Sequence, residues 1–377
     1  MKKFIQRLTR KQFLWGLSGM IAFCIGLVLY AVSTHVAVKQ DTQDIVSRWS
    51  DKKDVSQVSC FFSREAQVSE DSIHLFEHNL DKALEEASIV TESDNEDARL
   101  WADAYSATGN VSLESDRGSM TVSAVGIGGD FFLFHPLYLI SGAYFSGNDV
   151  MQDYIVVDED VAWQLFGSND VVGQLVTISG IPHIITGVIK REEGKLAEAA
   201  GLSSSVAYVS YSTLSQYGTD FGINTYEIVM PNPVSGYARK YVSENIGVDE
   251  NNVDIVENTT RYSLLARIKL LTQFGTRSMS SKAIIYPYWE NIARGYEDIL
   301  GFLFLIMVLF FMYPSILLLI GLISAWKHKT WTAKGVFLKI QDKWQRQMDK
   351  FRCHRAQSKS LKKSKFRHEE EKNEKKL

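Results

Sequence analysis

The sequence predicts an α+β domain held between two transmembrane helices. Three observations support this prediction. Two long apolar stretches lack any charge, the region between them alternates strand-like and helix-like segments separated by turn residues, and charge divides the ends of the chain from its middle.

The two apolar stretches are long enough to cross a bilayer. The first runs from Phe13 to Val32 and the second from Ile299 to Trp326. A hydrocarbon core of about 30 Å needs roughly 20 apolar residues in a helix. A cleaved signal peptide is the alternative for the first stretch, but the apolar part of such a peptide is usually about 7–15 residues long. We therefore expect two uncleaved membrane anchors.

The charge distribution predicts the orientation of these anchors. The first 11 residues contain five Lys/Arg and no acid, and the segment from Lys327 onward contains 17 Lys/Arg and 6 Asp/Glu, a net charge of +11. The region between holds 19 bases and 38 acids, a net charge of −19 that the overall −3 conceals. Basic residues beside membrane helices stay in the cytoplasm. We therefore expect residues 1–12 and 327–377 inside the cell, and residues 33–298 outside.

The first part of the outer domain has clear element signals. Residues 55–63 are rich in β-branched and aromatic residues, as in a strand. Capping candidates at Ser69 and Ser72 precede a helix predicted to end at residue 88. Its apolar stripe consists of Ile73, Phe76, Leu80 and Leu84. Residues 98–127 read as successive strands with turns at 108–110 and 116–119.

The rest of the domain alternates irregularly, which favours α+β over repeated βαβ units. A helix at 159–166, ended by Gly167, and a second helix at about 235–245 are expected. A loop is predicted at 195–204. The predicted strands are 154–158, 175–179, 183–189, 205–209 and 226–230.

We identify no catalytic, cofactor-binding or metal-binding set of residues. Gly194-Lys195 is the only Gly-Lys pair, and Ile189 occupies the place of the first glycine of a phosphate-binding loop. The chain is therefore not expected to be an ATPase. His74 and His78 are spaced i, i+4 on a predicted helix and offer a metal-dependent surface enzyme as a minor alternative. Cys60 lies alone in the outer region, so no disulfide is expected within it.

Residues near the second span suggest mechanical or interfacial roles. Aromatic side chains favour the membrane interface, where an apolar ring and a polar tip are both accommodated. An interfacial collar, or alternatively a contact surface for a partner subunit, is predicted from Tyr286, Tyr288, Trp289 and Tyr296. Pro314 interrupts the middle of the span, and both a hinge and an ordinary membrane-helix proline fit this position.

The basic tail contains an amphipathic pattern. Apolar residues recur at spacings of three or four among lysines and arginines, which is typical of a helix on an anionic membrane surface. These residues are Val336, Phe337, Ile340, Trp344, Met348 and Phe351. Docking to a cytoplasmic ATPase is the alternative. Lipid is expected as the anion bound, and nucleic acid is not, because the tail is tethered to the membrane.

An ordered set of short motifs resembles a known family. The motifs run from Gly128 to Ile189 and comprise GGDFF at 128–132, LISGAYF at 139–145, Asp149, YIVVD at 154–158, AWQLFG at 162–167, VG at 172–173 and TGVI at 186–189. In this order they are similar to the extracytoplasmic core domain of MacB-type ABC transporter permeases. The resemblance implies a porter-like α/β part, made by residues 55–120 and 221–262, and an inserted β-rich part at about 120–215.

The resemblance also implies partners and a location. Such permeases transmit ATP hydrolysis on a cytoplasmic ATPase to the outer domain through long helices. They have three further spans after that domain, whereas this sequence has one, so we expect a chain truncated after its second transmembrane helix. A separate ABC ATPase and another permease subunit are therefore expected as partners, in the bacterial inner membrane. The alternative function is a membrane-anchored surface signalling or scaffold protein, for example one that regulates cell-wall enzymes.

Overall fold

The computed structural model describes residues 10–38, 45–50, 54–90, 98–191, 194–202, 205–220, 222–277 and 283–327, with residues 341, 344, 345 and 348. Two compact units make up the chain. One consists of Cys24–Leu309 and holds the whole α+β domain, and the other consists of Met1–Phe23 with Phe310–Leu377.

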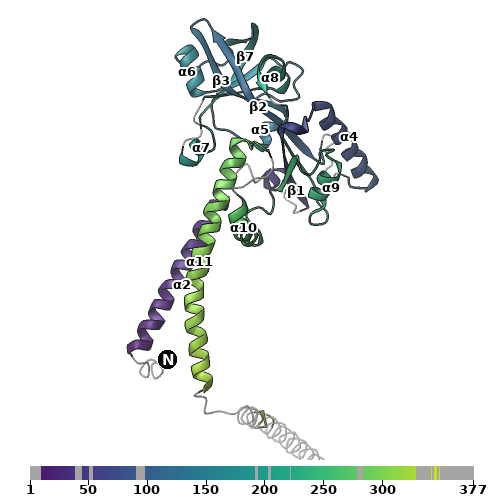
Figure 1. The fold of residues 1–377 in the computed structure, drawn as a ribbon. Coiled ribbons are helices and arrows are strands. Elements are labelled where there is room, and N and C mark those ends of the chain that lie inside the picture. Colours follow the sequence, from purple (N-terminus) through teal and green to yellow (C-terminus); the bar gives the residue numbers. More distant parts are fainter. Residues whose placement is uncertain are drawn as a thin grey trace, which may run out of the picture. The chain divides into compact units, whose positions relative to one another are not determined.

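An antiparallel sheet forms the first half of the α+β domain. Its strand order is β11 (Val253–Glu257), β1 (Val55–Phe62), β10 (Thr225–Pro231) and β2 (Ala102–Ser115). Helices α4 (Glu70–Glu86) and α9 (Tyr237–Asn245) cover one face beside β1 (Figure 1). Their buried side chains, including Phe76, Leu80 and Val242, share one apolar core with those of β1 and β10.

The other face of this sheet is covered by short elements and by the start of a long helix. These are α3 (Ile45–Trp49), α5 (Phe131–Phe134) and the first turn of α11 (Tyr288–Lys327). Ile45, Phe131 and Trp289 belong to the apolar core on this side, together with Val229 of β10. The sheet therefore lies between two packed layers, as an α+β domain requires.

A ring of strands forms the second half. Strand β2 pairs with β3 (Gly118–Gly129), and the pairing continues through β8 (Val206–Ser210), β5 (Tyr154–Asp158), β7 (Ile181–Ile189) and β6 (Leu175–Ile178). Strand β6 then pairs with β2 again through Leu113 and Glu114, which closes the ring. Helices α6 (Glu159–Phe166) and α8 (Tyr211–Tyr217) contribute Leu165 and Leu214 to its core.

The remaining elements are short or peripheral. They are the 3₁₀ turn η2 (Arg64–Ala66), β4 (Leu139–Gly142), α7 (Lys195–Ala199), β9 (Thr219–Asp220) and α10 (Leu264–Arg277). Strand β4 extends the sheet from β7, and β9 pairs with β2.

Helix boundaries follow from local capping. Ser69 accepts a hydrogen bond from the backbone N–H of Ser72, and the Ser72 hydroxyl accepts one from the N–H of Ser69, which is a capping box. Asp158 caps α6 by accepting a hydrogen bond from the backbone N–H of Val161, and Gly167 ends that helix at a φ of 72°, where a glycine is unstrained.

The structure confirms the prediction of an α+β domain between two membrane-length helices, with some differences in the elements. The turn predicted at 108–110 is wrong, because β2 continues through it to Ser115. A Cβ at Gly109 would lie 2.1 Å from the Thr219 carbonyl oxygen, so this glycine allows β9 to approach closely. The predicted loop at 195–204 contains α7, and α8 was not predicted.

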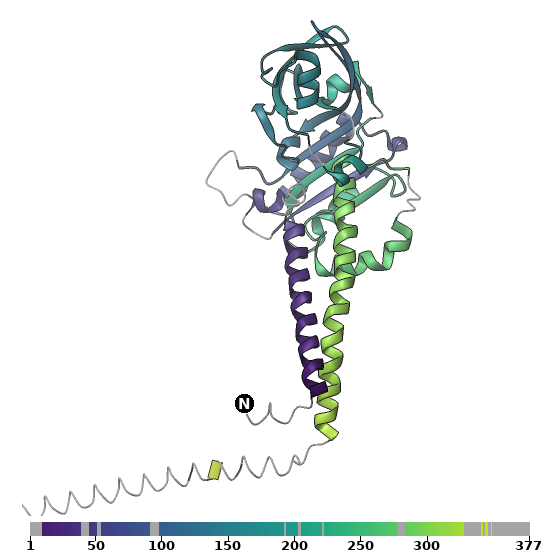
Figure 2. The ribbon, with the colours of Figure 1, turned by 90° about the vertical axis from the view of Figure 1, so that its left-hand side faces the viewer.

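Both apolar stretches lie in longer helices. The first lies in α2 (Arg10–Val38), and α11 begins 11 residues before the predicted second span. Both helices are long and apolar enough to cross a membrane. In the unit that contains residues 10–23 and 310–327, α2 and α11 lie side by side (Figure 2), and the Phe23 and Phe311 ring centroids are 5.5 Å apart.

Candidate functional site

The first turn of α11 is inserted into the core of the outer domain. The side chain of Trp289 is only 4% exposed and packs edge-on against Phe131 at a centroid distance of 5.5 Å. The hydroxyl of Tyr288 lies 2.7 Å from that of Tyr208 on β8. An apolar helix start anchored in this way cannot shift without disturbing the packing of the domain.

A buried ion pair fixes the same turn to the sheet. Arg261, which follows β11, donates hydrogen bonds to both carboxylate oxygens of Glu290, at 2.7 and 2.8 Å. The two side chains are 3% and 1% exposed. Arg261 also donates a hydrogen bond to Glu297, which lies about two helical turns beyond Glu290 on α11. A bidentate arginine–carboxylate pair defines orientation as well as distance.

Arg294 extends this network across α11. It donates to Glu290 at 2.7 Å and to Asp254 of β11 at 2.8 Å. Its guanidinium carbon lies 3.7 Å from the centroid of the Tyr286 ring, and the Tyr286 hydroxyl donates to Asp254 at 2.8 Å. Burial is the main reason that the pKa of Tyr286 is raised to about 12. The helix is therefore tied to β11 by two arginines.

A chain of hydrogen bonds continues from Arg261 into the sheet. Arg261 donates to Asn258 at 3.3 Å, and the amide of Asn258 donates to the Ser59 hydroxyl at 2.6 Å. Ser59 in turn donates to Glu227 at 2.6 Å, and Glu227 pairs with His135. These residues come from β1, β10 and the end of α5, so a buried polar path leads from α11 across the sheet.

Charges in this path are held by their partners. Burial alone would lower the pKa of Arg261, but Glu290 and Glu297 raise it well above its ordinary value. Burial likewise opposes ionisation of Glu227, yet His135 and Ser59 hold its pKa below the usual range. Buried charges that are paired in this way become costly when one partner is removed.

Helix α10 connects the same region to both long helices within the unit Cys24–Leu309. Arg267 donates to the Ser33 hydroxyl of α2 and to the carbonyl oxygen of Tyr262. A Cβ on Gly301 of α11 would lie 3.0 Å from Leu270. A cavity of about 750 Å³ lies beside α10, with Arg261, Arg267 and Leu300 among its lining residues. Packing contacts and ion pairs thus join α10, α11 and the end of the sheet in this region.

Most predicted interfacial aromatics contact protein. Trp289 is buried, Tyr288 meets Tyr208, and Tyr286 meets Arg294, whereas Tyr296 is half-buried on α11. Their role at a membrane interface stays a prediction. Sequence analysis missed Glu290 as a partner for Arg261. The i, i+4 spacing of Glu290 and Arg294 could have predicted that pair on the helix, but no local signal connects Glu290 to Arg261, which lies 29 positions earlier.

Pro314 lies inside α11, which remains helical on both sides of it. A Cβ on Gly19 of α2 would lie 3.8 Å from the Pro314 Cβ and 3.1 Å from Leu317, so the two helices approach closely here. Hinge motion at Pro314 stays a prediction.

Two residues of the predicted tail helix, Trp344 and Met348, are described. Both are helical and exposed. Val336, Phe337, Ile340 and Phe351 lie outside the described residues.

His74 and His78 are the candidate metal ligands in the sequence. His74 pairs with Glu77 at 3.0 Å on α4. Within the described ranges, no group of three or more His, Cys, Asp or Glu side chains is arranged to hold a metal ion.

Comparison with known proteins points to one family. The profile of the family described as the MacB-like periplasmic core domain matches residues 18–242. A protein named macrolide export ATP-binding/permease protein MacB from Chromobacterium violaceum is 27% identical over 96 residues, which is 25% of this chain and 14% of that protein. The protein of the same name from Neisseria gonorrhoeae is 33% identical over 76 residues, or 20% of this chain and 12% of that protein. The matches therefore span a small part of these relatives.

Two solved structures are also similar. The periplasmic region of MacB from Actinobacillus actinomycetemcomitans is 17% identical with a TM-score of 0.37, covering 58% of this chain and 92% of that chain. The extracellular domain of the noncanonic ABC-type transporter YknZ from Gram-positive bacteria is 16% identical with a TM-score of 0.34, covering 53% and 99% of the two chains.

Proposed function

Because the chain belongs to the MacB-like periplasmic core domain family, we propose that it is a non-enzymatic membrane component of an ABC transporter, coupled to a separate ATPase. The observation that carries the proposal is the insertion of α11 into the outer domain. One helix contains both an apolar stretch of membrane-spanning length and the Glu290 that pairs with Arg261. A displacement of this helix would reach β1 and β10 through packed and hydrogen-bonded groups.

The proposed location is the bacterial inner membrane, with the α+β domain outside and both termini in the cytoplasm. Two apolar helices and the family match support a membrane protein with an extracytoplasmic domain. The basic residues at both ends support the orientation. Cytoplasmic basic residues, including those of the predicted tail helix, would then face anionic lipid or the ATPase.

Cysteine labelling tests the orientation. Val150 is 97% exposed, so a Val150→Cys chain should react with a membrane-impermeant maleimide added to spheroplasts. Cys353 should react only after permeabilisation, and Cys60 is buried. Cys24 lies in the first span, and a Cys24→Ser background removes it. Labelling of Cys353 in sealed spheroplasts would contradict the orientation.

Purification of the intact complex tests the transporter assignment. The tagged full chain, extracted in mild detergent, should co-purify with an ABC-type ATPase and with a further permease subunit, both identified by mass spectrometry. Recovery without any ATPase would overturn the proposal. Recovery with cell-wall enzymes alone would favour a scaffold protein.

A second experiment addresses coupling. In the purified complex, addition of ATP and vanadate should change hydrogen exchange in β1 and β10. Arg261→Gln should abolish this change while the ATPase continues to hydrolyse ATP, because the link from Glu290 to the sheet is lost. The matched control is Lys240→Gln, which removes an exposed partner 3.8 Å from Glu244. An unaltered response in a folded Arg261→Gln complex would contradict coupling through this pair.

A further inference from the structure

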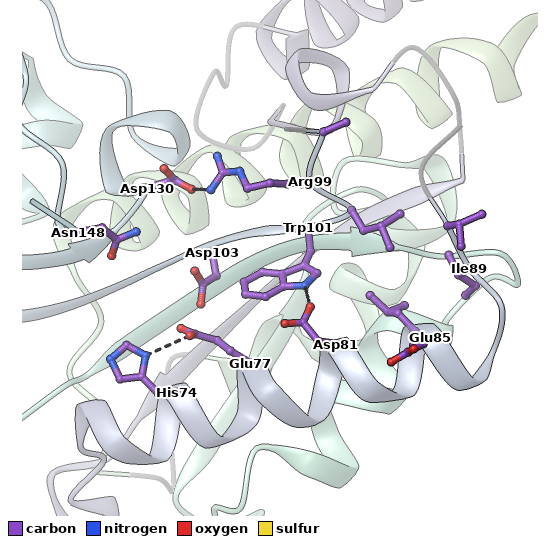
Figure 3. A pocket seen from close by; sticks show the side chains of 14 residues that line it. His74, Glu77, Asp81, Glu85, Ile89, Arg99, Trp101, Asp103, Asp130 and Asn148 are labelled. Carbon is purple, nitrogen blue, oxygen red and sulfur yellow. Dashed lines mark hydrogen bonds and ion pairs between the residues drawn. The ribbon is translucent and has the colours of Figure 1, made fainter. Parts of the chain in front are cut away.

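A second pocket lies on the opposite face of the sheet from the start of α11. It has a volume of about 610 Å³ and is formed between α4 and the chain that leads into β2. His74, Glu77, Asp81 and Glu85 line it from α4, and Arg99, Trp101 and Asp103 line it from the other side (Figure 3). All of these residues belong to the unit Cys24–Leu309.

The charges of the pocket are mostly negative. Five carboxylates line it, namely Glu77, Asp81, Glu85, Asp103 and Asp130. Arg99 is occupied by Asp130 at 2.6 Å, and Asp81 accepts a hydrogen bond from the Trp101 indole at 2.7 Å. Arg99 is thus already paired, and His74 pairs with Glu77 at 3.0 Å, so the end formed by Glu77 and Asp103 holds two neighbouring carboxyl groups beside one imidazole.

Asp103 is the unusual member of this group. It is 7% exposed, and its buried Oδ2 atom accepts no hydrogen bond. Figure 3 shows its carboxylate directed into the pocket, toward Glu77 and beside the Trp101 ring. Burial, followed by the neighbouring Glu77, raises the pKa of Asp103 well above its ordinary value. A buried acceptor without a donor is costly, and a donor supplied by a ligand would remove that cost.

The lining beyond Trp101 is mixed. Ile89 and Glu85 lie on the side of Trp101 away from Asp103 (Figure 3), and Leu84 and Leu100 also line the pocket. Trp101 itself offers a ring face beside the carboxylates, a surface that attracts cations as well as alkyl groups. The pocket therefore combines acidic groups with an aromatic ring and apolar side chains. Since the described residues hold no metal-binding group, the chemistry favours an organic cation over a metal ion.

From this geometry we propose that the pocket binds an aliphatic ammonium ligand. The ammonium group would donate hydrogen bonds to Asp103 and Glu77, and the alkyl body would lie along Trp101 toward Leu84 and Ile89. The inference stands apart from the transporter assignment, because it uses neither α11 nor an ATPase.

Calorimetric titration of the full chain in an uncharged detergent tests the proposal, with n-hexylamine as the probe. Hexylamine should bind saturably at one site, at least tenfold more tightly than hexanol, which has the same body without the charge. Asp103→Asn should weaken hexylamine binding at least tenfold, and Glu77→Gln should weaken it severalfold.

Glu114→Gln is the matched control, because Glu114 is an exposed carboxylate on the same strand, β2. It should leave hexylamine binding unchanged. Circular dichroism establishes folding, and if Asp103→Asn does not fold, the Glu77→Gln chain provides the decisive comparison. The proposal is overturned if the folded chain does not bind hexylamine, if hexanol binds equally well, or if Glu114→Gln weakens binding as much as Glu77→Gln.

Discussion

Arg261 and Glu290 form a bidentate ion pair that is buried on both sides, with N–O distances of 2.7 and 2.8 Å. One partner follows the last strand of the sheet, and the other lies in the first turn of the helix that carries the second apolar span. The pair therefore connects α11 directly to the end of the sheet. Its contribution to the free energy of unfolding can be measured.

Loss of Arg261 should strongly destabilise the protein. Arg261→Ala leaves Glu290 buried and, among the described residues, paired with Arg294 alone; breaking a buried pair typically costs about 3–5 kcal/mol. Urea titration of the detergent-solubilised chain measures the change in unfolding free energy. Lys240→Ala, at an exposed ion pair, should cost less than about 1 kcal/mol. If the two substitutions lowered the unfolding free energy equally, the large contribution of the Arg261–Glu290 pair to stability would be contradicted.

Asp158 should matter more than an ordinary helix cap. Its carboxylate accepts hydrogen bonds from Val161 and Val206, both at 2.8 Å, and thus serves α6 and β8 together. Asp158→Ala should cost about 2–4 kcal/mol, since a cap and a second buried N–H both lose their acceptor. The comparison is Ser69→Ala at the exposed cap of α4, expected to cost about 1 kcal/mol. A smaller loss at Asp158 than at Ser69, measured by urea unfolding, would refute this reasoning.

Gly109 should not tolerate a side chain. A Cβ there would meet the Thr219 carbonyl oxygen at 2.1 Å, so β9 would have to separate from β2. We expect Gly109→Ala to lower the unfolding free energy by about 1–3 kcal/mol. Ser112→Ala, at an exposed position of the same strand, should change it by less than about 0.5 kcal/mol. Thermal unfolding that leaves the two variants indistinguishable would rule out close approach as the reason for this glycine.

The pKa of Asp103 predicts a pH-dependent stability. Burial and Glu77, with a smaller effect of Asp130, raise this pKa, while Tyr226 of β10 lowers it. The folded state therefore retains a proton that the unfolded chain releases near pH 3.8. The contribution of Asp103 to stability is most favourable below that pH and is lost as the pH rises through the pKa of the folded state.

Asp103→Asn removes that dependence. At pH 7 the melting temperature should rise by at least about 2 °C, and the gain should shrink as the pH approaches 4. Differential scanning calorimetry between pH 4 and 7 measures both effects. Glu114→Gln, at an exposed carboxylate, should show neither. A lower melting temperature for Asp103→Asn at pH 7 would contradict the raised pKa.

Much of the architecture was readable from local patterns. Two charge-free stretches predicted the membrane-length helices, and the stripe from Ile73 to Leu84 predicted a helix with one buried face, as α4 has. Capping at Ser69 and the glycine at 167 marked helix ends because these signals act within a few residues. The order of the short motifs between Gly128 and Ile189 was also enough to indicate the family from the sequence.

Features that depend on distant residues were not readable in this way. Gly109 resembled a turn residue until β9, more than 100 positions later, was found against it. Glu290 and Glu297, the acidic partners of Arg261, lie on α11, and the pocket around Asp103 combines helix α4 with the start of β2. Periodicity and propensity report which face of an element is buried, but the partner on that face is chosen by the packing of the whole domain. The two apolar spans thus follow from composition, whereas the ion pair that links one of them to the sheet exists only once the chain has folded.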